Sequence, residues 1–266
     1  MTPVEISRGD GPVVLGLPHT GTWLPEEVFA RLNANGQALA DTDWHIHRLY
    51  DGLLPGVTTV RATFHRYLID ANRDPSGASL YPGQNTTGLV PLTDFDGEEI
   101  WQAPPDEAEI AARRAAYHTP YHAAIAAEMA RVKALHAVAI LYDCHSIRGE
   151  IPFLFRGNLP DFNIGTNGGT TCSPEVETAV TELCAAAPGY SSILNGRFKG
   201  GWTTRHYGRP AEGLHAIQME LAQRTYLAAE APPWTYDEAK AETLRAHLKT
   251  ILQTLAALAE PLGGSR

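Results

Sequence analysis

Two histidines in this sequence come directly after short apolar runs that have the composition of buried strands. His19 follows the run at 13–17, and His145 follows the run at 137–142. The carboxyl ends of neighbouring strands in an open α/β sheet form the crevice in which ligands bind. Two imidazoles delivered to such an edge indicate a metal site or a catalytic cleft.

An acidic residue, Asp43, completes a candidate metal site with His19 and His145. Two imidazoles and one carboxylate are the ligands of an open catalytic zinc site, whose fourth position holds water. The spacing matches no short helical metal motif, so the assignment depends on the joint placement of the three residues. Asp41 and His45 are alternatives for the carboxylate and imidazole ligands. We expect one Zn²⁺ per chain.

Glu220 is a single acid in the apolar run 214–221. Partial burial would raise the pKa of its carboxyl group toward neutrality, which suits a general base beside a metal-activated water. A salt bridge to Arg224 or Arg205 is the structural alternative.

Three residues beside His145 have alternative roles. Asp143 is a candidate acceptor for a hydrogen bond from a ligand histidine. Cys144 and Ser146 suggest nucleophilic catalysis, but the sequence offers no clear base with an orienting partner. We therefore interpret both as packing or supporting groups.

Several cationic residues are candidates for binding an anionic substrate, because the planar guanidinium group binds carboxylates through two parallel hydrogen bonds. Arg66 and Arg73 follow a β-rich stretch, and Arg205 and His206 lie in the glycine-punctuated segment 195–208, which has the composition of a binding loop.

The elements that must position these residues alternate between strand and helix. Strands are predicted at 13–17, 57–63, 67–69, 137–142, 151–155, 162–165 and 214–221. Helices are predicted from 106 to 118, 121 to 136 and 173 to about 187, with a last helix capped by Thr235, and 74–97 is predicted to be a long ordered loop. This pattern predicts an α/β fold with one domain over residues 1–266, built on a central mixed, mostly parallel sheet flanked by helices.

Composition narrows the class of partner. The formal net charge of −9 and the absence of any Lys/Arg-rich run argue against nucleic acid and anionic membranes, which leaves a small molecule as the expected partner. Three cysteines without metal-knuckle spacing favour a reducing compartment. With no signal-peptide pattern and no apolar run of membrane-spanning length, we expect a soluble cytoplasmic protein, as a monomer or small homo-oligomer.

Six short motifs together resemble the N-formylglutamate amidohydrolases over about residues 10–230. The motifs are Pro18–Gly21, Asp41–Trp44, Asp70–Arg73, Leu80–Asn85, Asp143–Ser146 and Gln218–Leu221. The resemblance implies hydrolysis of N-formyl-L-glutamate to L-glutamate and formate, the closing step of one histidine-degradation route. It also implies a fold similar to the zinc carboxypeptidases and aspartoacylases.

The resemblance implies specific roles for individual residues. His19 and His145 match the zinc-binding histidines, and Glu220 matches the catalytic glutamate. The Asn-Arg pair that holds a substrate carboxylate matches Asn72 and Arg73.

The acidic ligand departs from the pattern of the carboxypeptidase-like relatives. Those proteins take it from a His-x-x-Glu motif, whereas Thr22 stands three residues after His19. We therefore assign this place to Asp43. In the resulting hypothesis, Glu220 deprotonates the zinc-activated water, and Arg66 stabilises the tetrahedral oxyanion.

Two other functions are compatible with the sequence. One is hydrolysis of another small anionic N-acyl amino acid, or of a short peptide, by the same chemistry. The other is non-catalytic binding of acidic metabolites by the arginines alone, which would require no metal.

Overall fold

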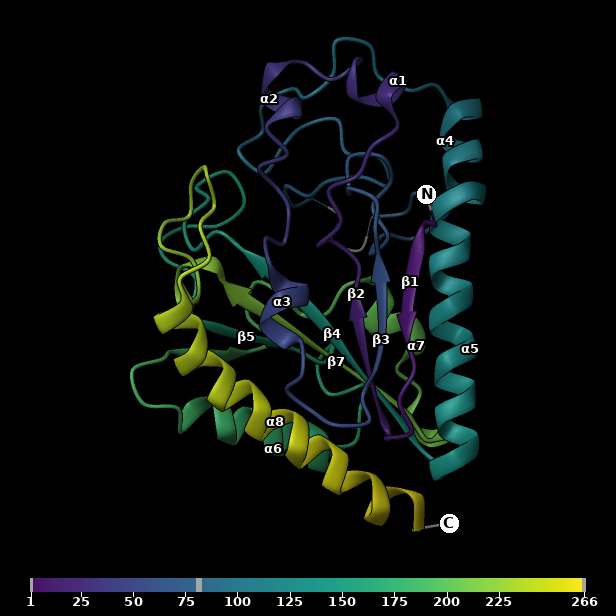
Figure 1. Cartoon of the computed structure of the whole chain (residues 1–266), viewed down its shortest axis with the longest axis vertical. Coiled ribbons are helices and arrows are strands. Elements are labelled where there is room, and N and C mark those ends of the chain that lie inside the picture. Colours follow the sequence, from purple (N-terminus) through teal and green to yellow (C-terminus); the bar gives the residue numbers. More distant parts are fainter. Residues whose placement is uncertain (1, 80–82, 265–266) are drawn as a thin grey trace.

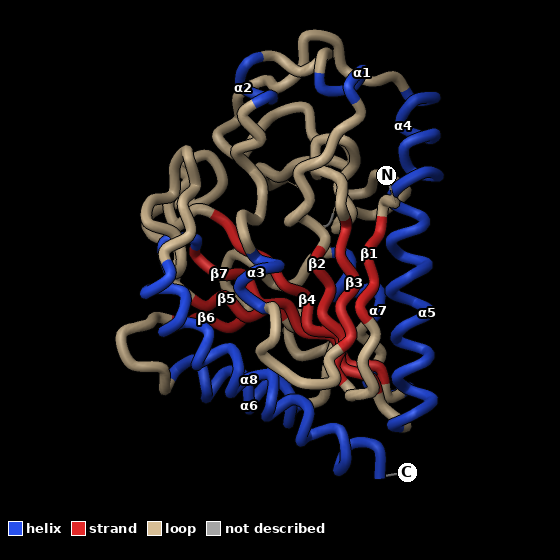
Figure 2. Tube along the Cα trace, viewed as in Figure 1, coloured by secondary structure: helices blue, strands red, loops and turns tan. Residues whose placement is uncertain are grey.

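The computed structural model describes residues 2–79 and 83–264, and a seven-stranded sheet forms its centre (Figure 1, Figure 2). Four of the six neighbouring strand pairs are parallel, while β1 runs antiparallel to β3 and β5 antiparallel to β7. The predicted mixed, mostly parallel sheet is therefore confirmed. In the spatial order β1-β3-β2-β4-β7-β5-β6, the strands are β1 (Val4–Ser7), β3 (Thr58–Ala62), β2 (Val13–Leu17), β4 (Ala139–Ile147), β7 (Leu214–Ala222), β5 (Phe162–Gly165) and β6 (Ser192–Leu194).

Helices cover both faces of the sheet. One face packs against α3, α6 and α8, and the other against α5 and α7, with the long α5 running along the sheet (Figure 1). A π-helix at Arg114–His118 joins α4 to α5. The helices are α1 (Glu26–Phe29), α2 (Ala34–Gln37), α3 (Ile46–Tyr50), α4 (Glu107–Arg113), α5 (Thr119–His136), α6 (Pro174–Ala185), α7 (Trp202–Tyr207) and α8 (Glu238–Gly264), and short 3-10 helices lie at Pro210–Glu212 and Gln223–Thr225.

The alternation of side chains along β4 separates core from site. Tyr142 and Cys144 enter the apolar core shared with α6 and α8, whereas Leu141 enters the core on the α5 side. Because side chains alternate with a period of two, Asp143 and His145 continue the face of Leu141. The same face thus changes from apolar to polar toward the carboxyl end of the strand, where the sheet opens to a cavity.

Several predicted elements differ from the structure. β4 continues to Ile147, so Asp143–Ser146 form the end of the strand rather than the loop after it. The predicted strands at 67–69 and 151–155 form turns. Residues 80–82, which include part of the Leu80–Asn85 motif, lie outside the described residues. Among the helices of the described residues, none has the length and apolarity needed to cross a bilayer.

Candidate active site

A cavity of about 620 Å³, part of it open to solvent, lies at the carboxyl ends of the central strands. Its walls combine strand-end residues with loops that are far apart in sequence. The lining includes, from the predicted site, His19, Asp43, Arg66, Asn72, Arg73, His145 and Glu220.

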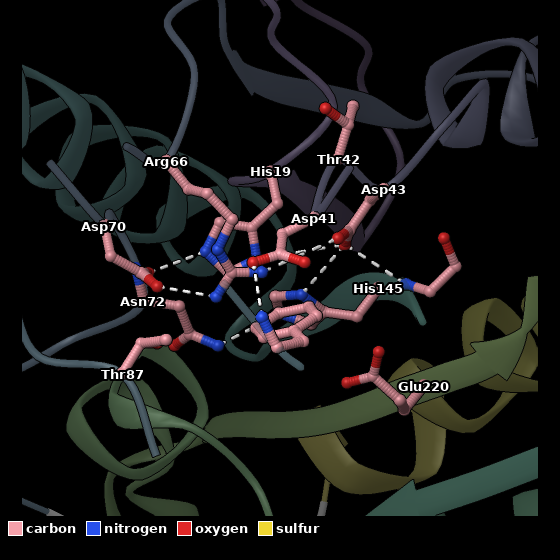
Figure 3. Close-up of polar contacts among 12 residues, drawn as sticks. His19, Asp41, Thr42, Asp43, Arg66, Asp70, Asn72, Thr87, His145 and Glu220 are labelled. Atoms are coloured by element: carbon pink, nitrogen blue, oxygen red, sulfur yellow. Dashed lines mark hydrogen bonds and ion pairs between the residues drawn. The ribbon is translucent and has the colours of Figure 1, made fainter. Parts of the chain in front are cut away.

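The two histidines and Asp43 meet at one end of this cavity (Figure 3). The Nδ1 atoms of His19 and His145 lie 3.8 and 3.2 Å from Oδ2 of Asp43, and one donor atom from each residue lies within 4.8 Å of the others. Donors around a tetrahedral zinc stand about 3.4 Å apart, because each bond is about 2.1 Å long. All three side chains are buried. The geometry of this group therefore fits a metal ion.

Each histidine has a carboxylate at its other ring nitrogen. Nε2 of His19 lies 2.7 Å from Oδ1 of Asp70, and Nε2 of His145 lies 3.2 Å from Oδ1 of Asp143. Such outer carboxylates fix the orientation of a ligand imidazole and increase its basicity. Asp143 was predicted in this supporting role, whereas Asp70 was not, although it begins the motif that supplied Asn72.

Asp70→Asn should weaken metal binding by about 10- to 100-fold, because the amide removes the carboxylate that orients His19. Metal affinity measured by competition with a chromogenic chelator checks this result. Asp74→Asn is the matched control, since Asp74 is half-buried and its carboxylate accepts the backbone NH of Ser76 within its own turn. Unchanged affinity in the Asp70 variant would remove Asp70 from the support of the site.

The charges around His145 also suit a cation. Burial alone would lower the pKa of His145, but the carboxylates of Asp143, Asp43 and Glu220 raise it well above its usual range. The carboxylates of Asp43 and Asp143 lie beside the two nitrogens of this imidazole and favour a positive charge there, which either a proton or a metal ion can supply. Burial, followed by the charge of Arg66, lowers the pKa of His19. His19 is therefore neutral, as a metal ligand must be.

Glu220 lies beside His145 because β4 and β7 are parallel and pair these two residues directly. Their side chains consequently project from the same face of the sheet. Gln218, on the same face of β7, donates from Nε2 to Oε2 of Glu220 at 3.1 Å and fixes the carboxyl group. Burial raises the pKa of Glu220 to about 8. A buried, oriented carboxyl group beside a metal site has the properties of a general base.

Arg66 is held against the same cluster by Asp70, which accepts a 2.6 Å hydrogen bond from its guanidinium group. Its guanidinium carbon also lies 4.7 Å from the centroid of the Phe95 ring. Burial alone would raise the pKa of Asp70, but Arg66, Arg73 and His19 hold it well below its usual range. Arg66 is therefore a fixed positive charge in the wall of the cavity.

Asn72 lies beside the outer ring nitrogen of His145. Thr203 donates its backbone NH to Oδ1 of Asn72, which leaves Nδ2 of Asn72 3.1 Å from Nε2 of His145. The backbone on either side of Asn72 is held as well. His122 donates from Nε2 to the carbonyl of Ala71 at 2.7 Å, and His118 donates from Nε2 to the carbonyl of Arg73 at 3.0 Å.

These two histidines come from the beginning of α5 and the π-helix before it. Single π-turns within helices are frequent at functional sites. Here the π-turn brings His118 against the segment that carries Asn72 and Arg73.

The structure does not bring all the predicted residues to the cavity. Among the described residues that line it, Arg205 and His206 are absent, and His206 stacks on Trp202 instead, with ring centroids 4.3 Å apart. Their assignment to substrate binding stays a prediction. Arg197, from the same glycine-rich segment, lines the cavity, and it was missed because the sequence does not show which way each arginine of that segment points.

The alternative ligands have other partners. Oδ2 of Asp41 accepts the backbone NH of Phe95 at 3.0 Å, and Nε2 of His45 bonds to the carbonyl of Trp234. Cys144 lies in the core on the opposite face of the sheet, where burial raises the pKa of its thiol well above the usual range. A buried, protonated thiol is a poor nucleophile, which agrees with the packing role assigned to Cys144.

The fold and the site together define an α/β enzyme with a buried cluster of histidines and carboxylates at the carboxyl edge of its sheet. The chain belongs to the N-formylglutamate amidohydrolase family, whose model matches residues 11–227. The resemblance inferred from the six motifs is thus confirmed, and the chain is an amidohydrolase.

Individual relatives match nearly the whole chain. An N-formylglutamate deformylase of Pseudomonas aeruginosa is 46% identical over 257 residues, and one of Pseudomonas putida is 43% identical over 258 residues, each match covering 96% of both chains. The crystal structure of an N-formylglutamate amidohydrolase from Ralstonia eutropha superimposes with a TM-score of 0.82 at 26% identity, covering 98% of this chain and 99% of the other.

Proposed function

We propose that the protein hydrolyses N-formyl-L-glutamate to L-glutamate and formate with one zinc ion held by His19, Asp43 and His145. The pairing of His145 with Glu220 in a cavity that Arg66, Arg73 and Arg197 also line carries the proposal. It is supported by relatives named N-formylglutamate deformylase that match the chain almost end to end. In this function the enzyme would catalyse the closing step of a histidine-degradation route.

The first step of the proposed reaction is the attack of water on the formyl carbon. A zinc ion bound there supplies Lewis acidity and lowers the pKa of water. Glu220 takes a proton from the attacking water as its oxygen bonds to the formyl carbon. Because Gln218 holds Oε2, Oε1 is the oxygen that receives this proton.

Other residues of the cavity stabilise the developing charge and hold the substrate during the remaining steps. The guanidinium group of Arg66 stabilises the negative charge that develops on the formyl oxygen. As the carbon–nitrogen bond breaks, Glu220 returns its proton to the departing amine. Asn72 and Arg73, next to the catalytic end, hold the α-carboxylate and so orient the formamide for attack.

Formate release from N-formyl-, N-acetyl- and N-succinyl-L-glutamate, with detection of the matching acid in each case, tests this function. We expect turnover of the formyl compound to exceed that of the others, and elemental analysis of the same preparation to give about one zinc per chain. Faster hydrolysis of acetyl- or succinyl-glutamate would instead identify a different N-acyl amino acid as the substrate. Full activity in the presence of a strong chelator, with no bound metal, would contradict the metal-dependent mechanism.

A further inference from the structure

Arg197 joins three loops at the wall of the cavity. Its Nε donates to the carbonyl of Leu154 at 3.0 Å, and one terminal nitrogen donates to the carbonyl of Asn85, also at 3.0 Å. Asn85 in turn donates from Nδ2 to the carbonyl of Phe153. The two carbonyl oxygens orient the guanidinium group. These contacts therefore fix a positive charge in the cavity wall.

The backbone that carries Arg197 is anchored on both sides. Asn195 accepts the backbone NH of Thr166 at 2.9 Å, and the backbone NH of Gly201 donates to Oε1 of Gln218 at 2.7 Å. Gln218 also orients Glu220, so the loop and the catalytic carboxyl group share one support. The position of Arg197 relative to the reaction centre is consequently well defined.

The surface beside Arg197 is apolar. Phe198, Leu154 and Ile147 line the same cavity, and they belong to one small hydrophobic cluster. Such a surface accommodates methylene groups, whereas the positive charge beside it requires an anion. The wall is thus complementary to a short aliphatic chain that ends in a carboxylate.

The position of the formyl group decides which of the two substrate carboxylates lies beside Arg197. The formyl group must lie at His145 and Glu220, and the α-carboxylate, close to the amide nitrogen, falls beside Asn72 and Arg73. The side-chain carboxylate extends two methylene groups further. The carbonyl groups of Leu154 and Asn85, which hold Arg197, belong to the loops of the cavity wall.

We propose that Arg197 binds the side-chain carboxylate of the substrate and selects acidic N-formyl amino acids over their neutral analogues. This inference rests on the deformylase function proposed above. A guanidinium group and a carboxylate form two parallel, charge-assisted hydrogen bonds, so an uncharged amide in the same place loses most of this interaction.

The test compares N-formyl-L-glutamate with N-formyl-L-glutamine, which has nearly the same shape but no side-chain charge. We expect Arg197→Gln to lower kcat/KM for formylglutamate by about 100-fold, the size expected when one partner of a desolvated charge pair is removed. For formylglutamine, kcat/KM of this variant should stay within about threefold of the wild-type value. The preference for the acidic substrate therefore disappears. Arg197→Lys, which keeps the charge but not the planar fork, should retain part of the preference.

A second variant separates recognition from loop structure. Arg148 donates to Asp96 at 2.7 Å, and this contact joins two of the same loops. Arg148 is not among the described residues lining the cavity, so Arg148→Gln should keep the preference. Loss of the preference in Arg148→Gln, or an equal loss of both activities in Arg197→Gln, would overturn the role of Arg197.

The wild-type enzyme distinguishes this inference from the proposed function. If it releases formate from formylglutamate and formylglutamine with equal kcat/KM, the selection by Arg197 is refuted while the deformylase function stands. If it releases no formate from either compound, the proposed function fails first.

Discussion

Replacing Glu220 with glutamine should lower kcat for N-formyl-L-glutamate by about 10³-fold or more, while the metal content remains that of the wild type. Loss of a positioned general base typically costs 10²- to 10⁴-fold, and here the same carboxyl group also returns the proton to the leaving amine. Glutamine keeps the shape of the side chain, so the cluster of His19, Asp43 and His145 should be undisturbed. Steady-state kinetics and elemental analysis on one preparation measure both quantities.

The control for this variant is Glu177→Gln. Glu177 is half-buried and accepts a hydrogen bond from Thr166, but it is not among the described residues that line the cavity. Its replacement should leave kcat near the wild-type value. If Glu220→Gln retained comparable turnover, another group would have to move the proton, and the assignment of the base would be wrong.

The raised pKa of Glu220 connects its proposed role as a general base with the proposed metal ion. With a pKa of about 8, most of this carboxyl group is protonated at pH 7 and cannot accept another proton. A cation between His145 and Asp43 favours the charged form and lowers the pKa, because opposite charges within a few ångström stabilise a carboxylate. The metal ion would thus convert a buried acid into a usable base, in addition to its effect on water.

Much of the site could be predicted because parallel strands bring their carboxyl ends together. β2 pairs with β4 and β4 with β7, so residues more than 100 positions apart in the sequence meet at one edge. The sequence shows the apolar runs and the polar residues that follow them. His19, His145 and Glu220 could therefore be placed without knowledge of the loops.

The contacts made by loops could not be predicted in the same way. Asp70 supports His19, and Arg197 crosses between Leu154 and Asn85. Neither contact follows from periodicity, since both depend on how irregular segments pack against each other. An arginine in a glycine-rich segment can point in many directions, and only the tertiary contacts distinguish Arg197 from Arg205.

The run at 67–69 shows why a short apolar segment was wrongly predicted as a strand. The run at 67–69 is apolar because it is buried, and it packs as a turn without extended pairing. A short apolar run indicates burial more reliably than it indicates a strand. Likewise, the last helix begins after Asp237, whose carboxylate accepts the backbone NH groups of Ala239 and Lys240, and not at the predicted cap Thr235.

Replacing His145, a proposed metal ligand, should have the other large effect, a loss of bound zinc. His145→Ala leaves one imidazole and one carboxylate, and we expect zinc affinity to fall by at least about 100-fold, since each ligand contributes a substantial part of the binding free energy. Zinc should be lost during purification, and turnover should fall with it. The variant also leaves Asp43, Asp143 and Glu220 without the imidazole that balances their charge, so the metal-free protein should unfold at a lower temperature than the metal-free wild type.

A buried histidine on the neighbouring strand provides the matched control for that experiment. His215 lies on β7, and its Nδ1 accepts the backbone NH of Ser173, at the end of the strand away from the cluster. His215→Ala should lower the melting temperature but keep one zinc per chain, because the loss of a buried hydrogen-bond partner does not alter the metal ligands. If His145→Ala bound zinc as tightly as this control, the metal would have to be held by other residues. Loss of zinc in His145→Ala alone would therefore separate ligation from general stability, which a melting curve by itself cannot do.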